Sequence, residues 1–452
     1  MQVTGSFVIV GPELCAKAED FSGRRDCGLI IKARQIMFCT STRGPEARLG
    51  WIMRAALLVL VSGLMMGTLG QAQELTGIAV LPARSFVQGP SSGQFIEPAN
   101  GVSPPFVGQQ PVQGLSALLY RDGRWLSMTD NGFGSQTNSA DYLLRVLELQ
   151  PDFRRQSGGA GQLGALSLFT LCDPDRQIRF PVVADRDFYP GSTIPVATEI
   201  RQRRCLTGAD LDIESFQQAP DNSFWFGDEF GPFLLHTDQH GIVLEPPFPL
   251  PGVMAPENPF LGATAPAARS SGGFESLAIS PDGRWLYAML EKPKNNQPGD
   301  RLAVYRFDIL NKVFNPLKPV WHYPLEDDKH RVGALLMIDW HRFFTVERDR
   351  LQGNQAGFKR IYEIKVEEHS DQPLIDKSLL LDLLAIPDPA GLASAGGLFR
   401  YPFATIEGLA RYDQQTLAVL NDNNFPFSLG RHLDSGEPDD SELILLRIED
   451  LR

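Results

Sequence analysis

Acidic side chains recur at equivalent places in five similar stretches of this sequence of 452 residues. Glu214, Glu275 and Glu407 each stand near the start of a short apolar run. A second set of acids and amides follows the next, aromatic-rich run and comprises Asp130-Asn131, Asp228-Glu229, Glu291, Glu347 and Asp422-Asn423. Because the start of one strand and the end of the next lie at the same edge of a hairpin, we predict that both sets converge on one face.

Carboxylates gathered in this way repel one another unless a cation neutralises them, and Ca²⁺ takes about six to eight oxygen ligands. We therefore expect a calcium site. Its expected metal ligands are Glu214, Glu275, Glu407, Asp228 and Asp422. The candidate catalytic residues are Glu275, Glu407 and Arg348, and the remaining site candidates are Asp130, Asn131, Glu229, Glu291, Glu347 and Asn423. Each acid taken alone is also explained by hydrogen bonds within a turn or by exposure to water.

Other catalytic machinery is missing from the sequence. No strand–GxSxG–helix nucleophile elbow, no HExxH motif and no phosphate-binding P-loop is recognisable in it. The seven histidines are scattered, and the spaced pair His236 and His240 falls in a strand-and-turn segment. Lys292 and Arg431 are, with Arg348, basic residues that could hold an anion beside the acids.

The elements that must position these acids are hairpins. The five stretches cover residues 114–132, 212–231, 272–291, 331–349 and 405–424. Turn sequences such as Asp122-Gly123 and Pro281-Asp282-Gly283 separate their apolar runs, which is typical of β-hairpins. Further strand-like runs follow, so that each unit holds three to four strands, the composition of a propeller blade.

We therefore expect an all-β fold, a β-propeller of six or seven blades of mostly four antiparallel strands, in one domain over residues 73–452. Residues 150–210 leave room for one more blade or a long insertion. The last strand, residues 442–448, is expected to pair with residues 75–82 and close the ring, which removes exposed strand edges. A pair of β-sandwiches is the alternative.

The N-terminal region resembles an export signal placed unusually deep in the sequence. Met53 and Arg54 precede an apolar stretch from Ala55 to Leu69 and a small-residue site at Gly70-Gln71-Ala72. We interpret residues 53–72 as a signal peptide and residues 1–52 as a mis-assigned upstream segment. An anchor helix or an unusually long signal region is the alternative. Cys172 and Cys205 then remain in the exported chain, as a disulfide or as two buried thiols.

The amino-acid composition limits the kinds of molecule that the chain is expected to bind. Hydrophobic residues make up 43% of the chain and its formal net charge is -12, which argues against nucleic acid. We expect a monomer without a stable membrane span after signal cleavage, located in the periplasm or outside the cell, with a small-molecule ester or phosphate as substrate.

Ordered motifs carry a resemblance to a known family. The segments DIESFQQAPDNSFWFGDEFGPF, GGFESLAISPDGRWLYAMLE, FFTVERD and TIEGLARYDQQTLAVLNDNNFPF resemble motifs of the phytase-like, "esterase-like activity of phytase" family, in the expected order. The resemblance spans roughly residues 75–452. It implies a bacterial exported β-propeller with phosphatase- or esterase-like activity. The first unit has Leu115-Ser116 where a later unit has Glu407-Gly408, and the fourth has Gly333-Ala334, so the sequence does not predict a complete acidic ring.

Three functions follow as hypotheses. The first is a metal-dependent hydrolase of phosphoric esters, in which the cation activates water and neutralises developing charge. The second is a non-catalytic propeller that binds a ligand or partner at the same face. The third is a lactonase-like hydrolase of carboxylic esters.

Overall fold

The computed structural model describes residues 73–295, 297–366, 375–449 and 451. All described residues belong to a single compact unit. The expected upstream segment 1–52 and the expected signal peptide 53–72 lie outside the described residues.

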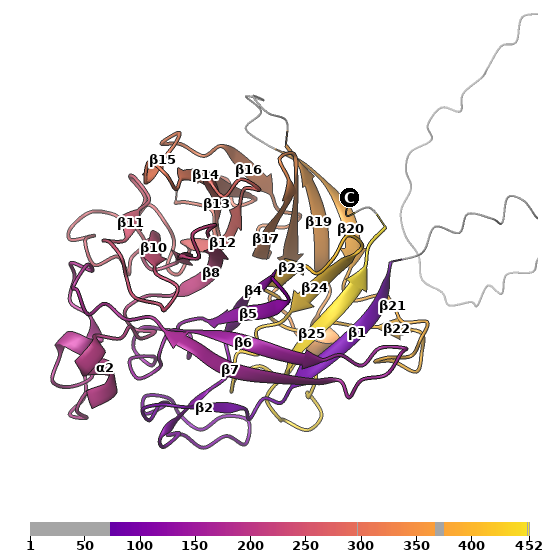
Figure 1. Cartoon of the computed structure of the whole chain (residues 1–452), viewed down its shortest axis with the longest axis horizontal. Coiled ribbons are helices and arrows are strands. Elements are labelled where there is room, and N and C mark those ends of the chain that lie inside the picture. Colours follow the sequence, from indigo (N-terminus) through magenta and orange to yellow (C-terminus); the bar gives the residue numbers. More distant parts are fainter. Residues whose placement is uncertain (1–72, 296, 367–374, 450, 452) are drawn as a thin grey trace, which may run out of the picture. The chain divides into compact units, whose positions relative to one another are not determined.

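The described fold is all-β, with antiparallel meanders as its main units (Figure 1). The first four follow chain order. The first meander comprises β4 (Leu115–Arg121), β5 (Arg124–Thr129), β6 (Arg145–Asp152) and β7 (Gln162–Thr170), and the second comprises β8 (Ile213–Gln218), β9 (Phe224–Asp228), β10 (Phe233–Thr237) and β11 (Phe248–Pro249). The third comprises β12 (Phe274–Ile279), β13 (Trp285–Leu290), β14 (Arg301–Asp308), β15 (Val313–Phe314) and β16 (Trp321–Pro324). The fourth comprises β17 (Arg331–Asp339), β18 (Arg342–Arg348), β19 (Lys359–Lys365) and β20 (Asp376–Asp382).

The fifth meander joins the two ends of the described chain. Its strands are β23 (Gly408–Arg411), β24 (Thr416–Leu420), β25 (Ser441–Arg447) and β1 (Glu74–Leu81). The antiparallel pairing of β1 with β25 confirms the predicted pairing of the last strand with the N-terminal one. Strand β1 also pairs in parallel with β7 at Val80 and Gln162, so the first and fifth meanders share one sheet.

Short elements complete the described structure. They are β2 (Phe86–Gln88) with β3 (Gln109–Pro111), β21 (Ile386–Pro387) with β22 (Leu398–Phe399), the 3-10 turns η1 (Val183–Asp185) and η2 (Gly353–Gln355), and the helix α2 (Thr198–Arg203). No described helix has the length and apolar character needed to cross a membrane.

The predicted turn chemistry explains the first hairpin. Asp122 and Gly123 lie between the paired residues Arg121 and Arg124 and have φ values of 53° and 78°. A two-residue hairpin turn with positive φ at both central positions matches the twist of the strands that it joins. The Asp-Gly prediction is therefore confirmed at this turn.

The first strands of the five meanders contact one another in cyclic order. Strand β4 contacts β8, β8 contacts β12, β12 contacts β17, β17 contacts β23, and β23 contacts β4. In Figure 1 these strands surround the middle of the folded unit, while strands such as β7 and β20 lie toward its outside. The starts of these strands are consequently brought around a common axis.

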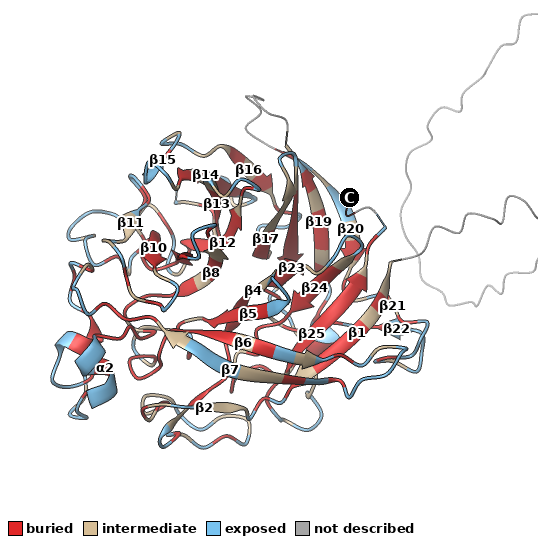
Figure 2. Cartoon of the chain, viewed as in Figure 1, coloured by how far each residue is buried: buried red, intermediate tan, exposed pale blue. Residues whose placement is uncertain are grey.

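Five apolar cores fill the spaces between neighbouring meanders. The alternation of side chains along a strand explains how one strand serves two cores. On β12, Leu277 packs into the core shared with β9 and β10, whereas Ala278 packs into the core shared with β17 and β18. The first strands are therefore buried on both faces, as the red ribbons of Figure 2 show.

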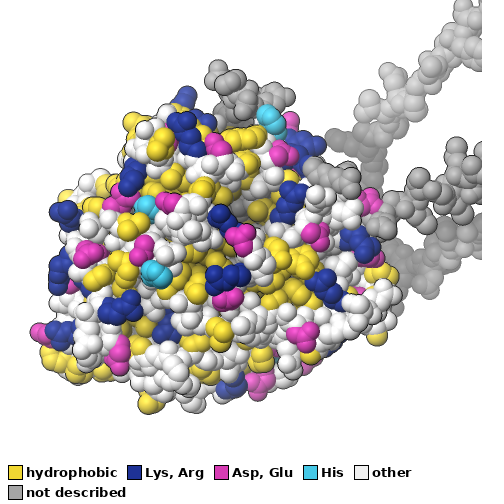
Figure 3. Space-filling view, viewed as in Figure 1, with side chains coloured by type: hydrophobic (Ala, Val, Ile, Leu, Met, Phe, Trp, Pro, Cys, Tyr) yellow, Lys and Arg dark blue, Asp and Glu magenta, His cyan; other side chains and the backbone are white. Residues whose placement is uncertain are grey.

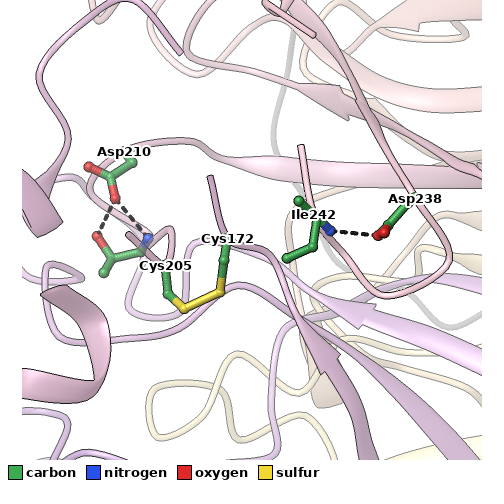
Figure 4. The surroundings of a disulfide bond; sticks show 6 residues. Cys172, Cys205, Asp210, Asp238 and Ile242 are labelled. Atoms are coloured by element: carbon green, nitrogen blue, oxygen red, sulfur yellow. Dashed lines mark hydrogen bonds between the residues drawn. A yellow bond between two sulfur atoms is a disulfide. The ribbon is translucent and has the colours of Figure 1, made fainter. Parts of the chain in front are cut away.

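Residues 171–212 form an insertion held by a disulfide. Cys172 and Cys205 are bonded, with their Cα atoms 3.8 Å apart, and both are buried. Of the two alternatives that the sequence left open, the structure contains the disulfide. The backbone at Cys172 also bridges to Ile242, whose amide donates to Asp238, while Asp210 lies on the Cys205 side of the bond (Figure 4). The bond thus fixes the stretch of chain that leads into β8.

Replacing both cysteines by serine is expected to lower the free energy of unfolding by about 2–4 kcal/mol, because the bond closes a loop in the unfolded chain. Cys172 and Cys205 are separated by 33 positions. Urea unfolding of the double variant measures the loss. A reducing agent should destabilise the unmodified protein and leave the variant unchanged. Equal stability of the two proteins without reductant would contradict the prediction.

Candidate functional site

A β-bulge at the start of the first strand turns one residue toward the central channel, the space that the five first strands enclose, in four meanders, and in three of them that residue carries a side chain. The pairing register shifts between Leu115 and Ala117, Ile213 and Ser215, Phe274 and Ser276, and Val332 and Ala334. The extra residues at these bulges are Ser116, Glu214, Glu275 and Gly333. A bulge inserts one residue and re-aims the side chain there. Together with Glu407, which directly precedes β23, these residues line a small cavity of about 20 Å³.

The bulge in the fourth meander carries glycine because no side chain fits there. A Cβ atom on Gly333 would lie 2.0 Å from the backbone oxygen of Ile406 and 3.1 Å from Cγ of Glu407. The close approach of these two chains therefore excludes a fourth glutamate. The acidic ring is incomplete, as the sequence indicated.

The hairpins bring the second set of acids to the same end. Ile213 pairs with Asp228, Phe274 with Leu290 and Gly408 with Leu420, so residues after the second strands lie opposite the bulges. Burial, and then the charges of Asp422 and Asp212, raise the pKa of Asp130 well above its usual value. Acids from the first, second and fifth meanders are therefore close enough to repel one another.

The other channel acids show the same effect. Burial, followed by the charges of Asp212 and Asp130, raises the pKa of Glu214 well above its usual value. For Glu275 the causes are burial and then Glu407 and Glu291. Burial raises the pKa of Glu407 to about 7 against the opposing effect of Arg348. A site that holds these groups ionised needs additional positive charge.

Asp212, Glu214 and Glu229 form the tightest group. One carboxylate oxygen from each lies within 4.8 Å of those of the other two. Oδ1 of Asp212 and Oε1 of Glu229 are buried and have no hydrogen-bond partner in the described part of the chain. Oε1 of Glu275 and Oδ1 of Asn423 share this condition. Buried oxygens that accept no hydrogen bond are free to bind a cation, so this set of oxygen ligands fits a divalent metal ion.

Basic side chains face the acids from the third and fourth meanders. Nη2 of Arg348 donates to Oε1 of Glu407 at 2.7 Å, and both groups are buried. Nζ of Lys292 lies 2.6 Å from Oε2 of Glu291, and Nε of Arg331 lies 3.7 Å from Oε1 of the same carboxylate. The site therefore has an acidic side and a side where acids and bases are paired.

Two predicted site residues lie outside the converging group. The carboxylate of Asp228 accepts the backbone amides of Asp212 at 2.9 Å and Gly231 at 2.6 Å, so it stabilises the turn after β9. Glu347 accepts from Tyr323 at 2.7 Å and Lys377 at 2.6 Å in a separate buried network. Neighbouring residues of a strand point to opposite sides, so Glu347 faces away when Arg348 faces Glu407.

Two other residues that the sequence analysis considered, Arg431 and His236, lie outside the channel and have partners elsewhere. Arg431 forms a two-pronged pair with Glu442, at 2.9 and 2.8 Å, and lines a different cavity. His236 contacts Glu245 at 2.7 Å and stacks on Trp225, away from the channel acids. On the outer face drawn in Figure 3, acidic and basic side chains are interspersed, whereas the channel acids are mostly buried.

Sequence reasoning missed Arg331. It is the first residue of β17, pairs directly with Arg348 across the ladder, and is nine-tenths buried. The signal was available in the fourth stretch, where Arg331 and Arg348 stand at the start of the first strand and the end of the second. Asp212 was visible only as part of an acidic series with Asp210 and Glu214. Asp210 instead accepts the amides of Val183 and Thr207.

Comparisons with known proteins give one family match. A family model described as "Phytase-like: Esterase-like activity of phytase" matches residues 110–425. An "Uncharacterized secreted protein" of Arthroderma benhamiae is 29% identical over 175 residues, which cover 31% of this chain and 33% of that protein. The matched region thus spans about a third of the length of this curated relative.

Solved structures with similar folds are distant. A PQQ-bound aldose sugar dehydrogenase of Streptomyces coelicolor is 13% identical, with a TM-score of 0.32, over 83% of this chain and 99% of that one. The Cps50 (Swd1) β-propeller domain of Myceliophteria thermophila is 12% identical, with a TM-score of 0.29, over 77% and 87% of the two chains. At these TM-scores neither similarity defines the fold or function of this chain.

The protein is expected to lose stability as the pH rises from 5 to 8 when divalent cations are removed. Burial raises the pKa values of Asp212 to about 6 and Glu407 to about 7, above those of the unfolded chain. Folding therefore takes up protons, and the free energy of unfolding falls with pH, by at most about 1.4 kcal/mol per unit for each such group. Melting temperatures of chelator-treated protein measure the slope.

Glu407→Gln should make this pH dependence shallower, whatever its effect on absolute stability, because the amide does not titrate. Glu437→Gln is the matched control, since Glu437 is exposed and pairs with Arg84 outside the channel. A melting temperature that stays constant or rises between pH 5 and 8 would contradict the prediction.

Proposed function

The chain belongs to the phytase-like family described by the esterase-like activity of phytase, and we propose that it is an exported, metal-dependent hydrolase of phosphoric esters. One observation carries this proposal. Carboxylates with buried, unpartnered oxygens converge on one side of the channel, and the buried side chain of Arg348 and the partly buried side chain of Lys292 face them from the other. Such a site suits a cation on one side and the anionic group of a substrate on the other.

We also propose that the fold is a closed propeller with the five meanders as its blades. The cyclic contacts of the five first strands and the five inter-sheet cores support this arrangement. Five is fewer than the six or seven blades expected from chain length. The difference arises because residues 171–212, where another blade had room, form the disulfide-bonded insertion.

Asp212, Glu214 and Glu229 are the residues that would hold the cation, with Ca²⁺ as the proposed ion. Their oxygens have the required proximity, and two of the carboxylates have a buried oxygen without a donor. Glu275, Glu407 and Asp422 surround the same space and remain candidate ligands. Asp228 is left out because backbone amides occupy its oxygens. A bound cation would supply charge neutralisation and water activation at this point.

Residues of the third, fourth and fifth meanders would orient the ester. Glu407 fixes the guanidinium of Arg348 through the buried pair at 2.7 Å, so that Arg348 can donate to a phosphoryl oxygen from a preset position. Glu275 lies between the acidic group and Arg348, and its buried Oε1 is free of donors. This oxygen can accept the proton of an attacking water, which makes Glu275 the proposed general base.

Export is proposed on three grounds. The matched relative is named a secreted protein, residues 53–72 have the pattern of a signal peptide, and the disulfide between Cys172 and Cys205 suits an oxidising compartment. A periplasmic or extracellular location fits all three.

Ca²⁺ is expected to raise the melting temperature of chelator-treated protein, because a ligand that binds only the folded state stabilises it by mass action. Glu214→Gln and Glu229→Gln should each reduce this Ca²⁺-dependent rise, since each removes one negative ligand. Glu363→Gln is the control, because Glu363 lies on β19 and pairs with Arg342. A full Ca²⁺ response in both channel variants would exclude this group as the metal site.

Hydrolysis of 4-nitrophenyl phosphate should require Ca²⁺ and should fall by about 10²–10⁴-fold in Glu275→Gln, the range expected for loss of a general base. Ca²⁺ affinity measured on the same variant separates the two roles of Glu275, because activity lost at saturating Ca²⁺ indicates a general base, whereas weakened Ca²⁺ binding indicates a metal ligand. Assays with 4-nitrophenyl acetate test carboxylic esters in parallel. Cleavage of the acetate alone would favour the lactonase-like alternative, and Ca²⁺ binding with no cleavage of either ester would favour a binding protein.

A further inference from the structure

Two buried arginine side chains lie side by side at the channel end of the fourth meander. Arg331 and Arg348 are directly paired residues of β17 and β18, and their exposed fractions are 9% and 4%. Directly paired residues of antiparallel strands have their Cβ atoms about 4.5–5.5 Å apart on the same side of the sheet. Like charges at such positions destabilise a sheet, so the arrangement calls for a compensating partner.

The partners within the described chain leave one N–H group of each arginine unsatisfied. Arg348 donates through Nη2 to Glu407, and Arg331 donates through Nη1 to the backbone oxygens of Asp328 and His330. The Nε atoms of both arginines are buried and have no hydrogen-bond acceptor in the described chain. For Arg331, the carboxylate of Glu291 at 3.7 Å lies beyond hydrogen-bond reach. Buried unpaired donors of charged groups are costly and indicate a missing acceptor.

The surroundings add further positive charge. Burial, and then the charges of Arg350, Arg348 and Arg269 against that of Glu291, lower the pKa of Arg331. Burial, with the charge of Arg348, lowers the pKa of Lys359 to about 8 despite its hydrogen bond to Asp349. The nearby carboxylates of Glu407 and Glu291 already bind Arg348 and Lys292. Against the effect of burial, the charges of Glu407, Glu275 and Glu291 raise the pKa of Arg348, so Arg331 is the guanidinium with the greater need for an added anion.

We propose that Arg331 and Arg348 form a two-guanidinium receptor for a tetrahedral oxyanion, a phosphate group, at the channel end of the fourth meander. The proposal rests on the proposed function, of which it is a refinement, and assigns Arg331 as a substrate-binding residue. Two guanidinium groups approach from two strands, and each can donate to separate oxygens. A phosphate offers enough oxygens for both, whereas a carboxylate has only two in one plane.

Isothermal titration of inorganic phosphate into chelator-treated protein tests the receptor apart from metal and catalysis. The unmodified protein should bind phosphate at millimolar concentrations, and acetate should not compete. Arg331→Gln should weaken phosphate binding by about tenfold or more, as expected for loss of a charged hydrogen-bonding group. Arg331→Lys should retain part of the affinity, because lysine keeps the positive charge but lacks the planar guanidinium group that can donate two parallel hydrogen bonds. Arg301→Gln is the matched control, since Arg301 is the first residue of β14 and is exposed.

Ca²⁺ affinity measured on the same variants separates a lost receptor from a lost fold, and Arg331→Gln should bind Ca²⁺ as the unmodified protein does. Phosphate binding that is absent in the unmodified protein, or unchanged in Arg331→Gln, overturns the receptor even if the protein hydrolyses esters. Arg331-dependent phosphate binding supports it even if no ester is cleaved. Titration with 4-nitrophenyl phosphate in place of phosphate tests whether the receptor is a substrate site. A substrate site binds both compounds. Binding of inorganic phosphate alone would overturn the assignment of Arg331 to substrate binding.

Discussion

Repulsion among carboxylates buried in one channel is the constraint on which the rest of this structure depends. Asp130, Asp212, Glu214, Glu275 and Glu407 come from four meanders, and burial raises the pKa values of all five. At Asp130, Glu214, Glu275 and Glu407 the negative charges of neighbouring acids add to this effect. A flexible chain would separate such groups. Here the five inter-sheet cores fix the strands that carry them, so apolar packing offsets the electrostatic cost.

The β-bulges convert this scaffold into a site. In a regular strand, alternation sends every side chain into one of the two flanking cores, where a carboxylate would be buried without partners. The bulges at Glu214 and Glu275 release one residue from that alternation and aim it at the axis. The same position is a serine in the first meander and a glycine in the fourth. At Gly333, the approach of Ile406 leaves no space for a side chain. The resulting asymmetry separates an acidic side of the channel from a side that carries Arg331 and Arg348.

Acids that look alike in the repeat therefore have different physical roles. Asp228 ends its strand as Glu347 does, yet the first satisfies a turn and the second holds Tyr323 and Lys377 in a buried network. Both have donors for their oxygens, whereas Asp212, Glu229 and Glu275 each keep one buried oxygen free. The presence of free oxygens, rather than acidity alone, distinguishes the candidate ligands from structural carboxylates.

The sequence by itself determined the all-β class, the Asp122-Gly123 turn, the pairing of the last strand with the N-terminal one, and the repeat positions that hold acids. Those features depend on local turn chemistry and on alternation within a few residues. Only the tertiary structure decided that residues 171–212 are an insertion and that Arg331 pairs directly with Arg348. It also decided that Glu347 and Arg348 point to opposite sides of their sheet. These outcomes depend on strand register, on bulges and on contacts between chains far apart in sequence. A shift of one residue in register reverses the side to which a side chain points, so the repeat pattern alone could not determine them.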